Sequence, residues 1–262
     1  MANKLKVGIT FIGYECMELM PRALEPWMSI RKRLNIVNEI ESLKISLSHG
    51  CFEETAKLGF PILSTDGCHA WMKDQERSGN VDNAIIYSDP MKEYDMWSGN
   101  YHWMKDDIDF LVMLNHDEMW TLDEIQKLFA FIEFNPLVDY YKVNFKNYCI
   151  NEQTWVDDFI VPRMWWTKRN GGLKGFYKDE LVEYNDGTKD FQRAFGTVPS
   201  RLIFPKHLTW VGSKAYLQRK LNFQALRFGA CSYAWDEQND CLKLNDDFYA
   251  RFPVTKPQLH HD

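Results

Sequence analysis

Four consecutive polar residues directly follow an apolar run near the middle of the chain. Residues 110–114 are all apolar, and residues 115–118 read Asn-His-Asp-Glu. A short unbroken apolar run is typical of a strand buried on both faces of a sheet. Ligands of α/β sheets bind just beyond the carboxyl ends of such strands, and oxygen ligands there suit a hard divalent cation that carries a phosphorylated substrate. The alternative is a strand followed by a helix cap, since Thr121 and Glu124 form a capping box. Both can hold, because the helix starts after residue 118.

The elements around this motif alternate between strand and helix patterns. Extended patterns cover residues 5–12, 42–47, 110–114 and 139–148, with further extended pieces around 162–166 and 173–177. Helical patterns cover 15–27, 52–58, 101–106, 121–134 and 213–227, whereas the polar stretch 64–99 is expected to be loops with short elements. This order predicts an α/β class with a mixed sheet. Because neither a repeat nor a low-complexity linker interrupts the chain, we expect one domain over residues 1–235, followed by an acidic tail at 236–262.

The composition excludes several classes of protein. No apolar run approaches the roughly 20 residues that span a bilayer, and the N-terminus lacks a signal-peptide pattern, so a cytoplasmic location is expected. The six cysteines are scattered without a Cys-x-x-Cys pair, which favours reduced thiols and argues against a zinc site. The aromatic content of 15% suits a protein that binds rings such as sugars or bases, although aromatic residues also fill cores.

The charges are unevenly distributed. Residues 162–178 hold five basic side chains and no acidic one, and residues 191–235 hold seven and no acidic one. These windows carry +12, so the net charge of −6 leaves −18 for the remainder. The segregation suggests an anionic ligand in the C-terminal half. Solvated helix faces are the alternative for some of these residues, notably Arg219 and Lys220.

Several motifs, taken in order, resemble those of inverting family 2 glycosyltransferases with the GT-A fold. Residues 114–118 match that family's Leu-Asp-Ala-Asp-Glu, with Asn115 in place of the first Asp. Asn100 lies nine residues before Asp109, where the family has an Arg-Asn pair. Residues 204–213 resemble the run that contains the family's metal-binding His, here His207, and residues 162–175 resemble its Pro-Arg-aromatic segment. The resemblance spans roughly residues 5–225.

The resemblance implies a GT-A, Rossmann-like mixed sheet flanked by helices, of the nucleotide-diphospho-sugar transferase type. The donor half would cover about residues 1–120 and the acceptor half about 121–235. A divalent ion, Mn or Mg, held by Asp117 and His207 would bridge the phosphates of a nucleotide sugar such as a UDP-sugar and stabilise the leaving group. Since Asn115 supplies no charge, transfer without a metal remains open.

The resemblance also assigns catalytic and donor-binding residues. An inverting transfer needs a general base that deprotonates the acceptor hydroxyl. By the family's order this is Asp179, with Glu180 second and Asp158 third. The predicted donor-binding residues are Phe11, Gly13, Tyr14, Asn100, Asn115 and Arg163.

Three other functions compete with a glycosyltransferase that acts on a saccharide or lipid-linked acceptor. The acid-free basic windows and the aromatic residues are compatible with a phage-type glycosyltransferase that modifies hydroxymethylated pyrimidine bases in DNA. A nucleotidyltransferase shares the sheet and the metal–carboxylate site but normally has a glycine-rich phosphate loop, and near the first strand this chain has only Gly8 and Gly13. A catalytically inactive module that binds sugar or nucleic acid would explain Asn115.

Overall fold

The computed structural model describes residues 4–178, 180–251 and 258–261. The chain divides into two compact units, the first of residues 1–144 and 160–205 and the second of residues 145–159 and 206–262. The boundaries of these units differ from the expected boundary near residue 120 between a donor half and an acceptor half. The assignment of donor and acceptor binding to those halves stays a prediction.

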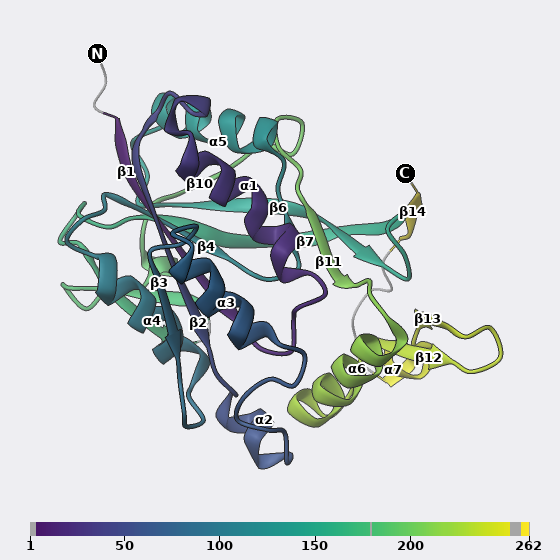
Figure 1. Ribbon diagram of the computed structural model, residues 1–262. Coiled ribbons are helices and arrows are strands. Elements are labelled where there is room, and N and C mark those ends of the chain that lie inside the picture. Colours follow the sequence, from purple (N-terminus) through teal and green to yellow (C-terminus); the bar gives the residue numbers. More distant parts are fainter. Residues whose placement is uncertain (1–3, 179, 252–257, 262) are drawn as a thin grey trace. The chain divides into compact units, whose positions relative to one another are not determined.

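The first unit is built on a mostly parallel sheet (Figure 1). The strand order is β3-β2-β1-β4-β7-β6, with β10 pairing β6. β1 is parallel to β2 and β4, β2 is parallel to β3, and β7 is antiparallel to β4. The strands are β1 (Leu5–Gly13), β2 (Ile40–His49), β3 (Asn83–Ile86), β4 (Phe110–Leu114), β5 (Glu118–Met119), β6 (Tyr140–Cys149), β7 (Thr154–Trp166) and β10 (Phe195–Thr197), of which β6 and β7 each have residues in both units.

Helices and a hairpin complete the first unit. They are α1 (Met20–Lys32), α2 (Glu53–Lys57), α3 (Cys68–Arg77), α4 (Glu93–Met104), α5 (Leu122–Phe134) and the hairpin of β8 (Leu173–Lys178) and β9 (Leu181–Tyr184), with 3-10 turns at Leu34–Ile36 and Asp190–Gln192. The sheet separates α1 and α5 on one face from α4 on the other (Figure 1). All five residues of β4 are buried, as the apolar run predicts.

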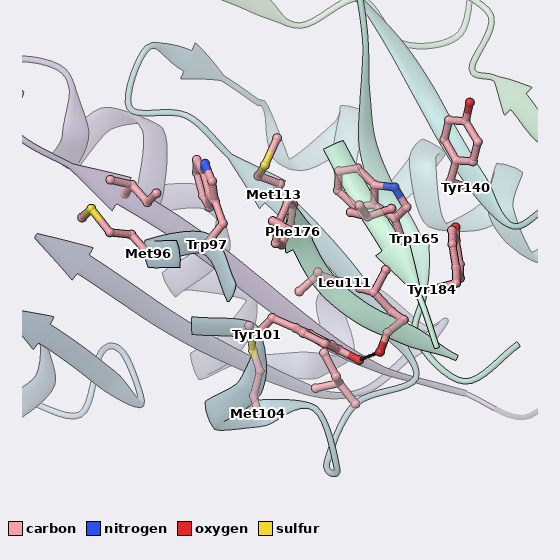
Figure 2. Packing of buried hydrophobic residues seen from close by; sticks show 14 residues of the cluster. Met96, Trp97, Tyr101, Met104, Leu111, Met113, Tyr140, Trp165, Phe176 and Tyr184 are labelled. Atoms are coloured by element: carbon pink, nitrogen blue, oxygen red, sulfur yellow. Dashed lines mark hydrogen bonds between the residues drawn. The ribbon is translucent and has the colours of Figure 1, made fainter. Parts of the chain in front are cut away.

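The side chains of β4 alternate between two cores. Phe110 packs edge-on against Phe129 of α5, which itself contacts Trp27 of α1. Leu111 and Met113 point to the opposite core, which α4 and the β8–β9 hairpin close (Figure 2). Here the hydroxyl of Tyr101 donates to the carbonyl of Leu173 at 2.8 Å. These contacts fix the hairpin, and therefore the turn at its tip, to the sheet of the first unit.

The second unit contains the ends of β6 and β7 and the C-terminal elements. β11 (Lys206–Trp210) pairs with β6, and β14 (His260–His261) pairs with β7. α6 (Lys214–Phe228) is followed by a hairpin of β12 (Tyr233–Asp236) and β13 (Cys241–Leu244), and by α7 (Asp246–Arg251). A cavity of about 480 Å³ lies between α6, this hairpin and α7. The expected acidic tail thus contains β13, α7 and β14.

The sequence located most elements but missed some. The expected helix at 15–27 begins later, at Met20, because Pro21 occupies the first turn of α1 and Pro26 lies inside the helix. The stretch 64–99, expected to be mainly loops, contains α3, β3 and most of α4. The predicted Ser213 cap of α6 is confirmed, since its hydroxyl accepts from the amide of Tyr216 at 3.3 Å. Within the described ranges, no helix is long and apolar enough to cross a membrane.

Candidate functional site

The carboxyl ends of β1, β2 and β4 lie side by side in the first unit. Gly13 at the end of β1 pairs with His49 at the end of β2, and Phe11 pairs with Leu114 at the end of β4. In the order β3-β2-β1-β4, β2 and β3 lie on one side of β1, and the next strand in sequence, β4, lies on its other side. Such a switch point, at the carboxyl ends of two neighbouring strands, is where α/β sheets bind ligands. It lies between the segment after Gly13 and the segment after Leu114.

The segment after β4 is a tight turn at this switch point. The amide of Glu118 donates to the carbonyl of Asn115 at 3.2 Å. Asp117 is 4% exposed and Glu118 is fully buried. The predicted capping box is confirmed: Thr121 accepts from the amide of Glu124, whose side chain bonds back to Thr121. The motif and the cap coexist, as the sequence allows.

A buried ion-pair network connects this turn to β7 and to the β8–β9 hairpin. The guanidinium of Arg163 is fully buried; its Nε donates to Oε1 of Glu118 at 2.7 Å, and its Nη2 forms an ion pair with the same oxygen at 2.6 Å. Its Nη1 donates to Oε2 of Glu180 at 2.7 Å. Burial alone would lower the pKa of Arg163, but attraction to Glu118 and Glu180 outweighs it and raises the pKa above its ordinary value. Arg163, predicted to bind the donor, is thus held by two carboxylates.

Glu180, the second choice for the catalytic base, is positioned by two side chains. The amide nitrogen of Asn115 donates to its Oε1 at 2.8 Å, and Arg163 occupies its Oε2. Its side chain keeps 26% exposure, so a partner can still reach the carboxylate. Asp179, the first choice, lies outside the described residues, and the side chain of Asp158 lies outside them as well.

Of the donor-binding residues predicted around β1, two are buried. Phe11 is fully buried. Asn100 is also fully buried: its Oδ1 accepts from Ser46 at 2.9 Å and Ser48 at 2.7 Å, and its Nδ2 donates to the carbonyl of Phe11 at 3.0 Å. Asn100 therefore ties α4 to β1 and β2. These bonds give it a structural role, and contact with a donor stays a prediction.

The loop after Gly13 is fixed by a second loop, residues 61–66. The hydroxyl of Tyr14 donates to the carbonyl of Pro61 at 2.5 Å. Glu15 accepts from the amide of Thr65 at 2.6 Å, and Asp66 accepts from the amide of Met17 at 2.8 Å. Tyr14 is therefore presented at the switch point by an ordered loop.

A histidine pair that sequence reasoning missed lies at the same edge of the sheet. His49 is fully buried, its ring centroid lies 5.9 Å from that of Tyr14, and its Nε2 accepts from the amide of Ser64 at 3.2 Å. The ring of His69 is 5.4 Å away. Burial, and then repulsion by His69, lowers the pKa of His49 to about 4. His49 is thus neutral at neutral pH; its place directly after an apolar strand was the available sequence signal.

His207, the predicted metal ligand, lies in the second unit. Its ring stacks on Phe159 with centroids 4.2 Å apart. Its Nδ1 lies 3.1 Å from Oδ1 of Asn147, and the hydroxyl of Thr209 lies 2.5 Å from Nε2. Donation from Nδ1 to the amide oxygen would leave the Nε2 lone pair for a hydroxyl or a cation, as in metal-binding histidines.

The two predicted metal ligands belong to different units, Asp117 to the first and His207 to the second. Among the described residues, no group of three or more His, Cys, Asp or Glu side chains could hold a metal ion. The donor chemistry still fits a divalent ion bound to a diphosphate, because Mg²⁺ typically takes one or two protein side chains and completes its shell with phosphate oxygens and water. A metal held by Asp117 and His207 stays a prediction.

Several basic residues from the acid-free windows form ion pairs with acids outside them. Lys168 pairs with Asp109 at 2.8 Å, and Lys174 pairs with Glu183 at 2.7 Å. Arg193 also pairs with Asp186, and Lys214 with Asp240. The basic surplus of the sequence is therefore partly neutralised in space, which weakens the argument for a polyanionic ligand.

Comparison with known proteins supports the fold. A scan against protein-family models and a search of curated proteins found no match. Among solved structures, S. aureus TarS 1–349 is similar at a TM-score of 0.50 and 9% identity, over 86% of this chain and 72% of that chain. A second structure of S. aureus TarS is similar at a TM-score of 0.47 and 9% identity, over 90% of this chain and 45% of that chain. The mannosyltransferase PcManGT from Pyrobaculum calidifontis, in complex with GDP-Man and Mn²⁺, gives 0.45 and 10%, over 86% and 61%.

The likeness to TarS 1–349 shows a mixed α/β fold whose central, mostly parallel sheet is flanked by helices, as in GT-A glycosyltransferases. The predicted fold class and the predicted structural resemblance are confirmed. At 9% identity the likeness concerns the fold alone.

Proposed function

We propose that this chain is a glycosyltransferase that moves a sugar from a nucleotide-diphosphate sugar to an acceptor hydroxyl with inversion. The observation that carries the proposal is the network at the switch point of a GT-A fold, where Asn115 and Arg163 orient the carboxylate of Glu180. Buried hydrogen-bonded carboxylates can be purely structural. Glu180 differs, because it is partly exposed at the sheet edge where ligands of such folds bind.

A nucleotide sugar is the donor class that the fold supports. TarS, whose 1–349 form shares the fold, has also been solved in complex with UDP and with UDP-GlcNAc. In this chain, Gly13 and Tyr14 lie in the ordered segment at the end of β1, beside the end of β2. We assign the nucleoside to this segment and the diphosphate to the turn at 115–118.

Glu180 is the proposed general base; Asp179, its neighbour in the sequence, stays the other candidate. The acceptor hydroxyl loses its proton to the carboxylate while its oxygen bonds to the anomeric carbon, and the bond from that carbon to the diphosphate oxygen breaks on the opposite face. Asn115 acts as a positioning residue, since its amide nitrogen bonds to Glu180. A divalent ion bound at Asp117 would neutralise charge on the departing diphosphate.

The acceptor is proposed to be a saccharide or lipid-linked hydroxyl rather than a DNA base. Lys168 and Lys174 belong to the basic window at 162–178 that suggested DNA binding. They are paired with Asp109 and Glu183, respectively. Binding of duplex DNA that weakens steeply with added salt would reverse this preference.

Donor hydrolysis tests the proposal without knowledge of the acceptor. The chain is incubated with a panel of nucleoside-diphosphate sugars, with and without Mn²⁺ or Mg²⁺, and the released nucleoside diphosphate is measured. Binding is followed separately as a rise in melting temperature, because a ligand of the native state stabilises it by mass action. One nucleoside diphosphate is expected to stabilise the chain, and the matching sugar donor is expected to be hydrolysed slowly.

Substitutions separate the proposed catalytic role of Glu180 from the proposed metal-binding role of Asp117. Glu180→Gln is expected to lower turnover about 100-fold or more while donor binding persists, and Asp117→Ala is expected to weaken binding of donor with metal. Glu183→Gln, in the same hairpin but paired with Lys174 and Lys189, is the matched control and should leave both unchanged. If none of the nucleoside diphosphates shifts the melting temperature and none of the donors is hydrolysed, the chain is not a glycosyltransferase.

A further inference from the structure

Three sulfur atoms meet in the interior of the first unit, behind the segment that follows β1. The Sγ atoms of Cys16 and Cys68 lie 3.5 Å apart. The Sδ of Met20 lies 4.0 Å from Sγ of Cys16 and 3.7 Å from Sγ of Cys68. All three side chains are at most 1% exposed. Neither the fold nor the proposed transfer requires such a cluster.

Local structure explains how the three sulfurs come together. The carbonyl of Cys16 accepts from the amides of Leu19 and Met20, and this helical turn at the start of α1 places Met20 next to Cys16. Cys68 is the first residue of α3, and Asp66 accepts from both the Cys68 amide and the Met17 amide. The two segments that carry the thiols are thus held together by hydrogen bonds to the Asp66 carboxylate, independently of the sulfur atoms.

The triangle has the dimensions of a metal site. A point equidistant from three corners separated by 3.5, 3.7 and 4.0 Å lies about 2.2 Å from each corner, close to the metal–sulfur bond of about 2.3 Å in zinc–thiolate sites. Closely packed sulfurs in an ordinary core only need to avoid overlap. Here the three sulfurs already surround one bonding position.

We propose that Cys16, Cys68 and Met20 form a trigonal binding site for a soft monovalent metal ion, Cu(I) being the natural occupant. Thiolate and thioether sulfurs select soft ions such as Cu(I), whereas Mg²⁺ and Mn²⁺ prefer oxygen. Zn²⁺ is disfavoured because it takes four ligands and the thioether is a poor one for it. Binding of Cu(I) with release of one thiol proton leaves the buried site neutral, and release of the second leaves a single negative charge.

The surroundings fit a compact, dry site. A Cβ atom added at Gly13 would lie 2.9 Å from Sγ of Cys16, 3.2 Å from Sγ of Cys68 and 2.5 Å from Cε of Met72. The backbone at Gly13 and the methyl group of Met72 therefore close one side of the triangle. Access requires the segment after Gly13 to open, since the site is buried, so loading is expected to be slow. The proposal is independent of the transfer reaction, because none of the three sulfur residues has a role in it.

Anaerobic competition with a colorimetric Cu(I) chelator tests the site in the full chain. The chain is expected to retain one Cu(I) against the chelator. Cys16→Ser and Cys68→Ser should each abolish retention, and Met20→Leu, which conserves volume, should weaken it about 10- to 100-fold or more. Cys51→Ser is the matched control, because Cys51 is also fully buried in the first unit, and it should retain the ion fully.

The outcomes distinguish a site from a sulfur-rich core. Retention in the Cys16→Ser and Cys68→Ser variants that equals retention in the unchanged chain, an unchanged chain that retains no copper, or conversion of the two thiols to a disulfide on copper addition would each overturn the proposal. If the serine variants fail to fold, X-ray absorption of the copper-loaded full chain decides. Three sulfur neighbours at about 2.2–2.3 Å, reduced to two in Met20→Leu, support the site, and nitrogen or oxygen neighbours refute it.

Discussion

Arg163→Met is expected to destabilise the chain strongly, because the guanidinium balances a fully buried carboxylate. At 2.6–2.7 Å from Glu118, its gross attraction is about 6 kcal/mol in a medium of effective dielectric constant 20. Most of that gain is offset by desolvation of the two ions, each of which costs several kcal/mol. The net value of the pair is therefore small, but removal of one member leaves the desolvation cost of the other.

The expected loss follows from burial. Glu118 is fully buried, whereas the Glu180 side chain is 26% exposed and can be solvated. Arg163→Met should therefore cost about 3–5 kcal/mol, mainly through Glu118. That is a large part of a typical stability of about 5–15 kcal/mol. Replacing both partners, with Arg163→Met and Glu118→Leu together, should recover at least half of the loss.

Urea unfolding followed by tryptophan fluorescence measures these free energies. Lys127→Met is the control, because Lys127 pairs with Asp123 at the surface, with side chains 47% and 67% exposed, and such pairs contribute about 0–1 kcal/mol. The reasoning would be refuted if Arg163→Met lost as little free energy of unfolding as Lys127→Met. It would also be refuted if the loss in the double variant equalled the sum of the losses in Arg163→Met and Glu118→Leu.

Three further changes test the elements around the site by the same unfolding measurement. The pKa of His49 is about 4 in the folded chain, against an ordinary value of 6.5, so the unfolded chain binds more protons between these values. The resulting stability, at most about 3 kcal/mol, is present above pH 6.5 and lost as the pH falls towards 4, and His49→Gln should flatten this dependence. Thr121→Ala removes the capping box of α5 and should cost about 1 kcal/mol; no loss would mean that the cap is replaced by water. Gly13→Ala places a Cβ 2.5 Å from Met72 and should cost about 1–3 kcal/mol by overpacking, so unchanged stability would show that this edge of the core can relax.

The sequence was most informative where one local signal decides the structure. The apolar run of β4 and the Thr121–Glu124 box each require only neighbouring residues, and both are confirmed. α4 was placed too late because its exposed and buried positions do not separate by polarity: Trp103 is exposed, whereas Asn100 is fully buried and bonds to β1 and β2. Such a helix has no clear polar stripe, and therefore little helical periodicity to detect.

The site depended on contacts that local patterns cannot encode. Asn115 and Glu180 are separated by 65 positions, yet their side chains are bonded at 2.8 Å. Lys168 and Asp109 similarly pair across 59 positions, so counting charges along the chain overstated the basic surface. The motif indicated a site at Asp117 and Glu118. It did not predict the buried partner of Glu118, because Arg163 lies on β7, which pairs with β4 only in the folded chain.

Asn115 tests whether the departure from the family motif is a loss of function or a requirement of this site. Asn115→Asp restores the acidic residue at the first motif position but places a second carboxylate where the amide nitrogen now lies 2.8 Å from Glu180. Two carboxylates so close do not both ionise, so one of their pKa values should rise strongly. In Asn115→Asp, the acidic limb of the pH profile of donor turnover should therefore move to higher pH. Asn115→Ala, which removes the hydrogen bond without adding charge, should lower turnover and move that limb much less than Asn115→Asp does. Higher turnover in Asn115→Asp, with an unshifted pH profile, would mean that Asn115 serves the donor or the metal and does not position Glu180.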